Sequence, residues 1–348
     1  MEQQLSGRQS TILKLVVQEY VRTGRAVGSK ALTDRYQLGV SSATVRNEMG
    51  ELEEREYLHH PHTSAGRVPT DHGYRYYVEY LLGDPHLPVA EQMMIRRQFR
   101  QVEMQIESWI KLAAAVLADA CGNVSLVTPP RSRVERLRHF ELISLRDQVA
   151  LLILVTQAGA VHESILQFSE PVKQSTLSLL SRRLNAEIRN LQHTQIARAA
   201  DAATALPALV LRQIAETLQA REQQSQSEIL HEGLDRALQQ PEFSRGAGAQ
   251  HLLELLRDGA VLSAILPQLE LMDDVQIFIG SENRSADLRD FGVVMASYGA
   301  SDEITGYLGV LGPTRMPYGR SISMVRYLAQ VLSDLLRGVY QTDPNAVR

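Results

Sequence analysis

The stretch from Val40 to Leu82 restricts the fold more than any other part of the chain, because it places several local signals in a fixed order. At about 100° per residue, Val45, Met49 and Leu52 fall within one narrow sector of a helix, so that side must face a core. The valines around Ser41 have the spacing of a hydrophobic staple, which predicts a helix N-cap there. A helix that begins at this point presents free backbone N–H groups beside short hydroxyls, which suits a phosphate.

The charges of this predicted helix are divided along its length. No acid lies between Val40 and Asn47, whereas glutamates crowd the far half at positions 51, 53, 54 and 56. Only the first two turns can therefore approach a polyanion, as expected of a recognition helix that enters the major groove by its N-terminal end. The candidate DNA-contacting residues of this helix are Ser41, Ser42, Ala43, Thr44, Arg46 and Asn47.

The side chains at this helix tip have the chemistry of base reading. Asn pairs with adenine through two hydrogen bonds, Arg pairs with guanine, and Ser, Thr or Ala packs against a thymine methyl group. The alternative is an amphipathic surface helix whose outer face is merely small and polar. The segment that follows favours DNA reading. It reads as a short strand at Tyr57-Leu58, a loop from 59 to 67, a return strand at Val68-Pro69 and a helix capped by Thr70, which is the layout of a winged helix-turn-helix.

The loop of the predicted wing supplies further candidate contacts. His62, Thr63 and Ser64 are expected to touch phosphates, and Arg67 beside Gly66 is a candidate for the minor groove. For Arg67 the alternative is a salt bridge to the body of the domain. The histidines at 59, 60 and 62 also invite a metal site, but no Cys or paired carboxylate is positioned to complete a tetrahedral set, so no metal is expected.

Two more helices are predicted before the recognition helix. Ser6 and Gln9 form a capping-box pair, and an apolar stripe then runs to Gly24. Ser29 is expected to cap a short helix over 30–36, which brings Ser29 and Lys30 to the sugar-phosphate backbone. The alternative for Lys30 is a solvated surface lysine.

Composition narrows the class of protein. The 348 residues are 44% hydrophobic and 22% charged, which indicates two or three globular domains rather than disorder. The net charge of −4 excludes a basic nucleic-acid coat but allows a local positive face, which residues 1–50 supply. The single Cys121 lies in an apolar run and is expected to be buried. No signal peptide or long apolar span appears, so a soluble cytoplasmic protein without a membrane partner is expected.

After a linker at 83–88, apolar residues from Ile95 to Ala120 recur at alternating spacings of four and three. This pattern predicts one long helix, which either pairs as a coiled coil or, as we favour, lies across a sheet. Runs at 139–145, 149–156 and 161–168 predict an antiparallel meander, with the middle run as its central strand. Helical texture follows, including 206–224 and 228–238, and then strands from 275 and a last helix over 322–340. The order indicates one α+β domain with an all-helical insertion.

Several segments carry a resemblance to a known family. SSATVRNEM, PHTSAGRVPT and GYRYYVEYL, together with IGSEN (279–283) and GYLGVLGPTRMPY (306–318), are similar to the HrcA family of repressors of bacterial chaperone operons. The sequence departs from the family pattern at Glu56, where Gly is expected. Glycine there would ease the left-handed turn that ends a helix.

The resemblance implies a multidomain α+β protein. Its parts are a winged helix-turn-helix at 1–83, a GAF-like α+β domain at 84–170 and 269–348, and an inserted, mainly helical dimerisation domain at 171–268. It also implies a negative regulator of heat-shock operons that binds, as a homodimer, the inverted-repeat operator known as CIRCE. The chaperonin is the implied partner that sustains repression, and heat is implied to relieve it by diverting the chaperonin. Two joined copies match an inverted repeat because the operator symmetry follows the protein's twofold axis.

Two other functions compete with this hypothesis. One is a ligand-responsive winged-helix transcription factor whose GAF-like domain senses a small metabolite, with Glu282, Asn283 and Arg315 as candidate pocket residues. A satisfied turn and a domain-stabilising arginine are the alternative for these residues. The other is an enzyme with a nucleic-acid module, but the sequence has no P-loop, nucleophile elbow or zinc-protease helix. We therefore expect no catalysis and no cofactor.

Overall fold

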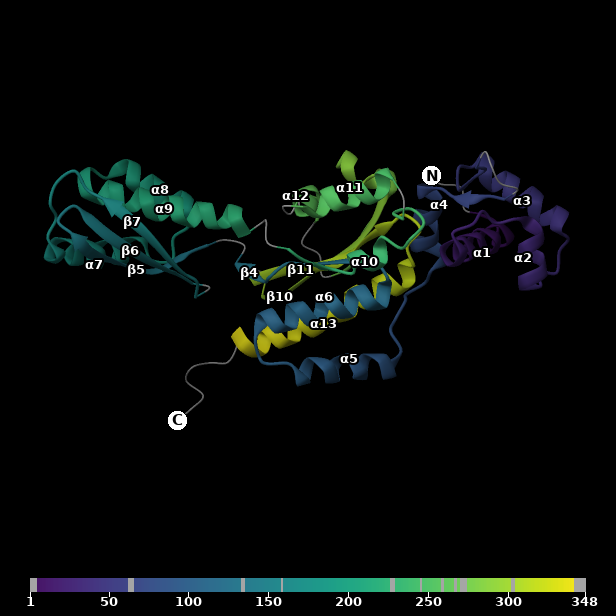
Figure 1. The fold of residues 1–348 in the computed structure, drawn as a ribbon, viewed down its shortest axis with the longest axis horizontal. Coiled ribbons are helices and arrows are strands. Elements are labelled where there is room, and N and C mark those ends of the chain that lie inside the picture. The colour runs from purple at the N-terminus through teal and green to yellow at the C-terminus, as the bar shows by residue number, and fades with distance from the viewer. Residues whose placement is uncertain are drawn as a thin grey trace. The chain divides into compact units, whose positions relative to one another are not determined.

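The computed structural model describes residues 5–61, 66–132, 135–157, 159–225, 229–244, 246–257, 260–265, 268–269, 274–301 and 304–340. The chain divides into two compact units. The larger unit comprises Met1–Pro129, Ile229–Tyr298 and Gly306–Arg348, and the smaller unit comprises Pro130–Glu228 and Gly299–Thr305. Figure 1 labels elements of both units.

The first part of the larger unit has its helices and short strands in the order predicted for a winged helix-turn-helix. Its elements in order are α1 (Gly7–Thr23), α2 (Ser29–Tyr36), α3 (Ser42–Glu54), β1 (Leu58–His59), β2 (Val68–Pro69), α4 (Asp71–Tyr76) and a π-helical turn, η1 (Tyr77–Leu81). The strands β1 and β2 pair antiparallel. The π-helical turn was not predicted from the sequence.

Several predicted local signals of this domain are confirmed. Ser6 and Gln9 form the capping box of α1, which ends at Gly24 in the left-handed conformation. The Thr70 side chain accepts a hydrogen bond from the backbone N–H of Gly73 and caps α4. Gly39 has a φ of +67° in the turn before α3. These caps satisfy backbone groups that the helix ends would otherwise leave unpaired.

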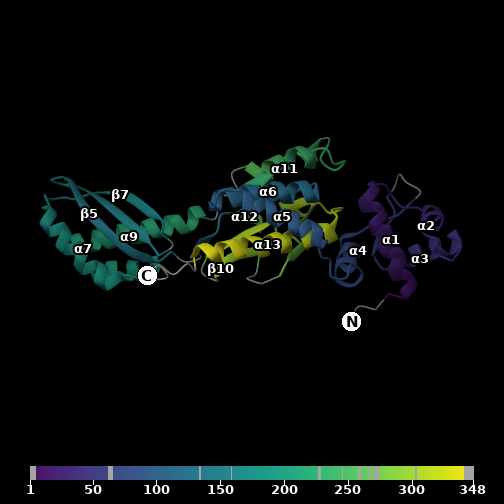
Figure 2. The same cartoon turned by 90° about the horizontal axis from the view of Figure 1, so that it is seen from below.

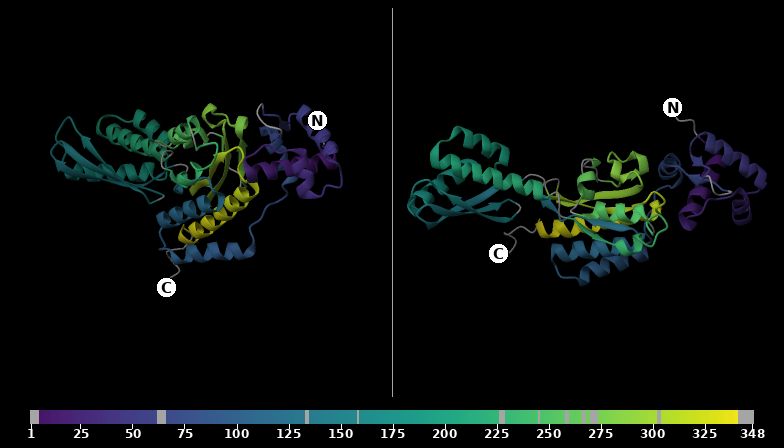
Figure 3. Two further views of the ribbon diagram at one scale, coloured as in Figure 1. Left: turned by 45° about the vertical axis from the view of Figure 1, so that its right-hand side comes forward. Right: turned by 45° about the horizontal axis from the view of Figure 1, so that its top comes forward.

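The second part of the larger unit is built on a sheet with the strand order β8-β3-β11-β10-β9. The strands are β3 (Val124–Val127), β8 (Leu230–Glu232), β9 (Gln276–Ile279), β10 (Phe291–Ser301) and β11 (Ile304–Pro313). Helices α6 (Ile106–Cys121) and α13 (Tyr318–Tyr340) cover one face, and α10 (Leu234–Ala237), α11 (Ala247–Leu256) and α12 (Ala260–Ile265) lie over the other (Figures 1 and 3). Cys121 ends α6 and is buried, as expected, and burial raises the pKa of its thiol to about 11.

The single long helix predicted across this sheet is wrong. Two helices, α5 (Val89–Gln101) and α6, are separated by a break after Gln101, and α5 folds back alongside the α6–α13 layer (Figure 3). The fold-back is held by Tyr327, whose hydroxyl donates to the Gln92 carbonyl at 2.7 Å, and by an ion pair between Arg320 and Glu91. Ile95 and Phe99 of α5 are buried in this arrangement. No Pro or Gly marks the break, so tertiary packing overrides the helical pattern.

The smaller unit contains the predicted meander, in which β6 (Val149–Thr156) lies between β5 (Leu137–Arg146) and β7 (Val161–Gln167) (Figure 2). The middle run is therefore the central strand, as predicted. One face packs on α7 (Gln174–Ile188), α8 (His193–Ala202) and α9 (Ala205–Ser225), with Phe140, Leu152 and Leu154 in the shared core. Burial alternates along β6 from residue to residue, so its other face is half-exposed.

The meander and the later strands belong to different sheets. The smaller unit begins at Pro130, before the meander, so the boundary expected at 171 is not where the two units divide. The insertion therefore contains the meander as well as helices, and the expected all-helical insertion is wrong.

The helix predicted over 228–238 is also wrong. Residues 230–232 form β8, which adds to the edge of β3, and only Leu234–Ala237 is helical. An available sheet edge outweighs a weak helical pattern because strand pairing depends on the neighbour.

None of the helices in the described part of the chain is long and apolar enough to cross a membrane.

Glu56 occupies the left-handed conformation with a φ of +61°, at the position where the family resemblance led us to expect Gly. We therefore predict that Glu56→Gly raises the free energy of unfolding of the winged-helix domain by about 1 kcal/mol. The left-handed conformation costs a residue that has a Cβ about 1–2 kcal/mol, and glycine avoids this cost. This gain outweighs the larger conformational entropy that glycine has in the unfolded chain. Urea unfolding of the full chain followed by circular dichroism checks this. The matched control is Glu54→Gly, which removes the same charge inside α3 and should be destabilising.

Candidate nucleic-acid interface

The N-terminal tip of α3 is the part of the winged helix with the chemistry to read DNA. The Ser41 hydroxyl accepts a hydrogen bond from the Thr44 backbone N–H at 3.1 Å, which confirms the predicted N-cap. Thr44 is half-buried, and the residues around it, Ser41, Ser42, Ala43, Arg46 and Asn47, are exposed. The first turn contains no acid. The tip therefore offers hydroxyls, an amide and a guanidinium together with the positive end of a helix dipole.

The opposite side of α3 fixes this orientation. Val45, Met49 and Leu52 are at most 1% exposed, as predicted from their spacing. Helices α1 and α2 both pack against α3, and α1 contributes a buried apolar stripe that includes Leu13 and Val16. A rotation of α3 that hid its polar tip would expose this apolar sector, so the packing holds the tip toward solvent.

The acids in the second half of α3 are held by partners from other elements. Arg8 donates to Glu48 at 3.2 Å, and the Gln9 amide donates to Glu51 at 2.7 Å. Neither partner was predicted from the sequence. The capping-box role of Gln9 was visible in the sequence, but nothing local indicated a contact 42 positions away. The Arg8–Glu48 ion pair offsets negative charge near the surface that a polyanion would approach, and the Gln9 amide holds the Glu51 carboxylate in place.

Arg67 makes the contact that was the alternative to the minor groove. Its Nε donates to the Glu53 carboxylate at 2.7 Å, and its side chain is only 21% exposed. Its backbone pairs with Val27 in an isolated bridge. The ion pair joins the start of the return strand to α3, so Arg67 holds these two elements together and is not a free cation.

The two candidates on α2 differ in exposure. Ser29 does not cap the helix, because α2 begins one residue earlier than predicted and Gly28 is the N-cap. Ser29 is 8% exposed, so its side chain has little surface to offer a phosphate. Lys30 is exposed, and its side-chain ammonium makes no hydrogen bond or ion pair with the described residues. Lys30 is therefore the α2 residue available for a phosphate.

The tip of the wing falls outside the described residues, and with it the candidates His62, Thr63 and Ser64. The described part of the wing shows the His60 ring nitrogen Nδ1 within 2.8 Å of the Gly66 carbonyl oxygen. Across the described part of the chain, no group of three or more His, Cys, Asp and Glu side chains is arranged to hold a metal.

The residues that sequence analysis weighed for a ligand pocket have structural roles. The Asn283 amide donates to the carbonyls of Gly280, Leu288 and Phe291 and so closes a turn. Arg315 pairs with Glu242 at 2.6 Å, and Glu282 pairs with Arg75. These contacts match the alternative of a satisfied turn and a stabilising arginine.

Known proteins resemble this chain along nearly its whole length. Residues 107–322 match the family model described as HrcA protein C terminal domain. The heat-inducible transcription repressor HrcA of Thermomicrobium roseum is 54% identical over 336 residues, which is 97% of each chain. The protein of the same description from Herpetosiphon aurantiacus is 41% identical over 348 residues, 98% of each chain. A crystal structure described as a hypothetical protein has a TM-score of 0.56 at 23% identity, covering 96% of this chain and 98% of that one, and it supports the fold alone.

The ion pair between Arg67 and Glu53 predicts a specific pattern of DNA affinity. Arg67→Ala should weaken binding to any duplex by about fivefold at low salt, because it leaves the Glu53 carboxylate uncompensated near phosphates. Adding Glu53→Gln should restore most of that loss. Fluorescence anisotropy on a random duplex measures both variants. If Arg67 instead entered the minor groove, the double variant would bind as weakly as Arg67→Ala alone.

Proposed function

The chain belongs to the HrcA family of heat-inducible transcription repressors, and from this premise we propose that it represses heat-shock operons by placing the tip of α3 in the major groove of an inverted-repeat operator. Family membership makes it a negative regulator of heat-shock genes and not an enzyme. The repressed operons are proposed to be those of the chaperonin and DnaK-type chaperones, with CIRCE as the operator.

The observation that carries the proposal is the exposed, acid-free tip of α3. Arg46 and Asn47 are exposed there and are proposed to read base edges, because their side chains offer paired hydrogen bonds to guanine and adenine. Ser41, Ser42, Ala43 and Thr44 are proposed to contact phosphates and thymine methyl groups. Lys30, together with the wing residues His62, Thr63 and Ser64, is proposed to hold the backbone of the duplex. Ser29 and Arg67 are left out of the proposed contacts because one is buried and the other is paired.

We propose that the smaller unit joins two copies of the chain through the open face of its sheet. Large apolar side chains are exposed on its strands, with 42% of Ile143, 52% of Leu145, 58% of Val161 and 69% of Ile165 accessible. Ile143, Leu151 and Ile165 are cross-strand neighbours, so they form one apolar row across the sheet. Apolar area of this kind marks an interaction surface.

Charge supports a second copy as the occupant of this face. Glu141 and Glu163 are both cross-strand neighbours of Ile153 and lie on one side of the apolar row, and Arg146, opposite Val149, lies on the other side. A twofold axis through the row would therefore set the glutamates of one copy against Arg146 of the other. Such a contact is self-complementary, as a dimer interface must be. The dimer would present two α3 tips to the two halves of an inverted repeat.

The remaining parts of the proposal follow from the family. The sheet domain of the larger unit is proposed to be GAF-like, and the insertion to be the dimerising domain. The chaperonin is proposed to sustain repression, and heat to relieve it by diverting the chaperonin. The protein would act in the cytoplasm, where the operators lie.

Substitutions at the tip of α3 test whether the winged helix is the reading head, the part of the protein that contacts the base edges of the operator. Asn47→Ala and Arg46→Ala should each weaken operator binding by about 10- to 100-fold and relax base preference. Lys30→Ala should weaken all sequences alike and lower the salt slope by about one unit. Footprinting on the gene's upstream region, followed by affinity measurements on operator and random duplexes, checks these effects. Equal losses on both duplexes for Asn47→Ala and Arg46→Ala would contradict base reading.

Substitution on the open sheet face tests the proposed dimer. Ile165→Glu should convert the dimer to monomer, because it places a carboxylate in an apolar contact. Leu179→Glu is the matched control, since Leu179 on α7 is also 69% exposed but lies off that face. Sedimentation equilibrium gives the mass of each variant. A dimer of unchanged stability in Ile165→Glu would rule out this face as the interface.

A further inference from the structure

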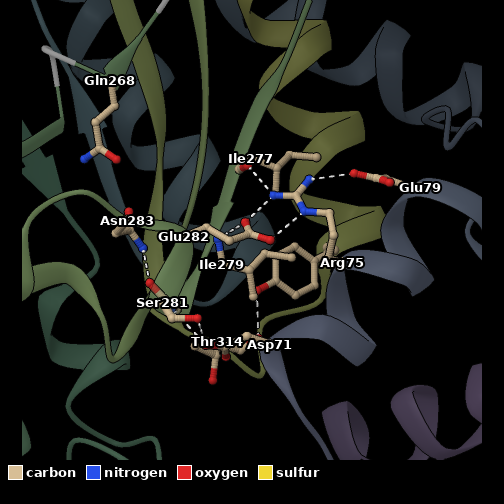
Figure 4. A network of polar contacts seen from close by, with 12 residues as sticks. Asp71, Arg75, Glu79, Gln268, Ile277, Ile279, Ser281, Glu282, Asn283 and Thr314 are labelled. Carbon is tan, nitrogen blue, oxygen red and sulfur yellow. Dashed lines mark hydrogen bonds and ion pairs between the residues drawn. The ribbon is translucent and has the colours of Figure 1, made fainter. Parts of the chain in front are cut away.

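A cluster of polar contacts joins α4 of the winged helix to the turn that follows β9 in the sheet domain (Figure 4). The Asp71 carboxylate accepts hydrogen bonds at 2.8 Å from both the backbone N–H and the hydroxyl of Ser281. One helical turn further along α4, the Arg75 guanidinium pairs with the carboxylate of Glu282. These partners are 210 and 207 positions apart along the chain. The cluster therefore connects two domains rather than neighbouring elements.

The pair of Arg75 and Glu282 has the geometry of a strong ion pair. Arg75 Nε donates to one carboxylate oxygen at 2.7 Å and its terminal nitrogen donates to the other, so the contact is bidentate. The same terminal nitrogen donates to the Ile277 carbonyl at 2.7 Å, and Glu282 also accepts from the Ile279 N–H at 2.8 Å. The side chains are only 26% and 29% exposed, and the hydrogen bond to Glu282 raises the pKa of Arg75. Arg75 of α4 is thus held at a fixed place against β9 and the turn that follows it.

Gly280 shows how closely the two domains meet. Its φ is +54°, and a Cβ at this position would lie 2.2 Å from the Asp71 carboxylate oxygen. A larger residue there would collide with the Asp71 carboxylate and displace it from its hydrogen bonds to Ser281. The backbone of the turn itself therefore forms part of the contact.

Two further contacts surround this cluster. Arg315 donates to the Val21 carbonyl at the end of α1 at 3.0 Å while it pairs with Glu242. Burial raises the pKa of Glu242, the Arg315 hydrogen bond lowers it, and the net shift is downward. The ring of Tyr74 on α4 lies 5.7 Å from that of Tyr318 at the start of α13. Helices α1 and α4 are thus both attached to the sheet domain.

The covalent connection between the domains does not by itself fix their orientation. The linker from Gly83 to Pro88 has no helix or strand, and Gly83 has a φ of +75°. Arg326 of α13 holds it through Asp84 at 2.8 Å, a pair whose carboxylate is largely exposed. Side-chain contacts, and above all those on α4, therefore set the direction in which the α3 tip points relative to the sheet domain.

We propose that Asp71 and Arg75 are positioning residues for operator recognition, which fix the direction of the reading head so that a dimer accepts only one spacing between half-sites. The proposal rests on the proposed function, since it requires a DNA-binding dimer. Half-sites on one face of B-DNA repeat about every 10–10.5 base pairs, and a shift of about five base pairs turns one half-site to the opposite face. A rigid reading head cannot follow that rotation. A reading head that moves freely on its linker can follow the rotation. Its effective concentration at a half-site with the best spacing is then lower.

The test measures affinity against half-site spacing for the full chain. Duplexes carry two half-sites whose separation increases in single base pairs over one helical turn, and a duplex with one half-site serves as internal reference. The variants are Arg75→Gln and Asp71→Asn, with Arg75→Lys as the conservative change that keeps the charge. Arg183→Gln is the matched control, because it removes an exposed arginine paired with Glu187 within α7.

For the unsubstituted chain and for Arg183→Gln, we expect the best spacing to bind about 100-fold more tightly than the spacing shifted by half a turn. Arg75→Gln and Asp71→Asn should each reduce this ratio by about tenfold and leave affinity for the single half-site unchanged. Arg75→Lys should give an intermediate ratio. An unchanged ratio in both variants, or an equal loss on the single half-site, would overturn the positioning role. Failure of the unsubstituted chain to bind a single half-site would instead count against the proposed function.

Discussion

The burial of one apolar sector of α3 is the interaction on which the rest of the winged helix depends. Val45, Met49 and Leu52 lose nearly all contact with solvent, so the helix can present only its other side to water. That side carries no acid in its first turn. The same packing therefore stabilises the domain and exposes the chemistry that family membership associates with a repressor. No further contact is needed to keep the tip of α3 exposed to solvent.

Local patterns in the sequence were sufficient to predict this domain. The capping box of α1, the cap at Ser41, the return strand and the cap at Thr70 all depend on residues within a few positions of one another. The meander was predictable for the same reason, because its strands are joined by short turns. The departure at Glu56 was also informative, since the left-handed conformation persists there without the glycine that favours it.

The features that the sequence did not reveal depend on contacts between distant positions. The pairing of Arg67 with Glu53 was an open alternative, because either partner is compatible with a charged surface. The break after α5 has no local signal and follows from packing on α13. The strand β8 exists only because β3 offers it an edge. In the same way, nothing near Arg75 in the sequence indicates Glu282, so the contact between domains required coordinates.

The buried thiol of Cys121 has a consequence for how this molecule responds to chemical stress. Burial raises the pKa of this thiol far above neutral pH, so the thiol stays protonated, and the sulfur is shielded from solvent. Oxidants and electrophiles react with the ionised, accessible form. In the folded protein, the single thiol is therefore protected from peroxide and from alkylating agents. Modification of that group would report that α6 has come away from its sheet, which makes it an intrinsic probe of loss of structure.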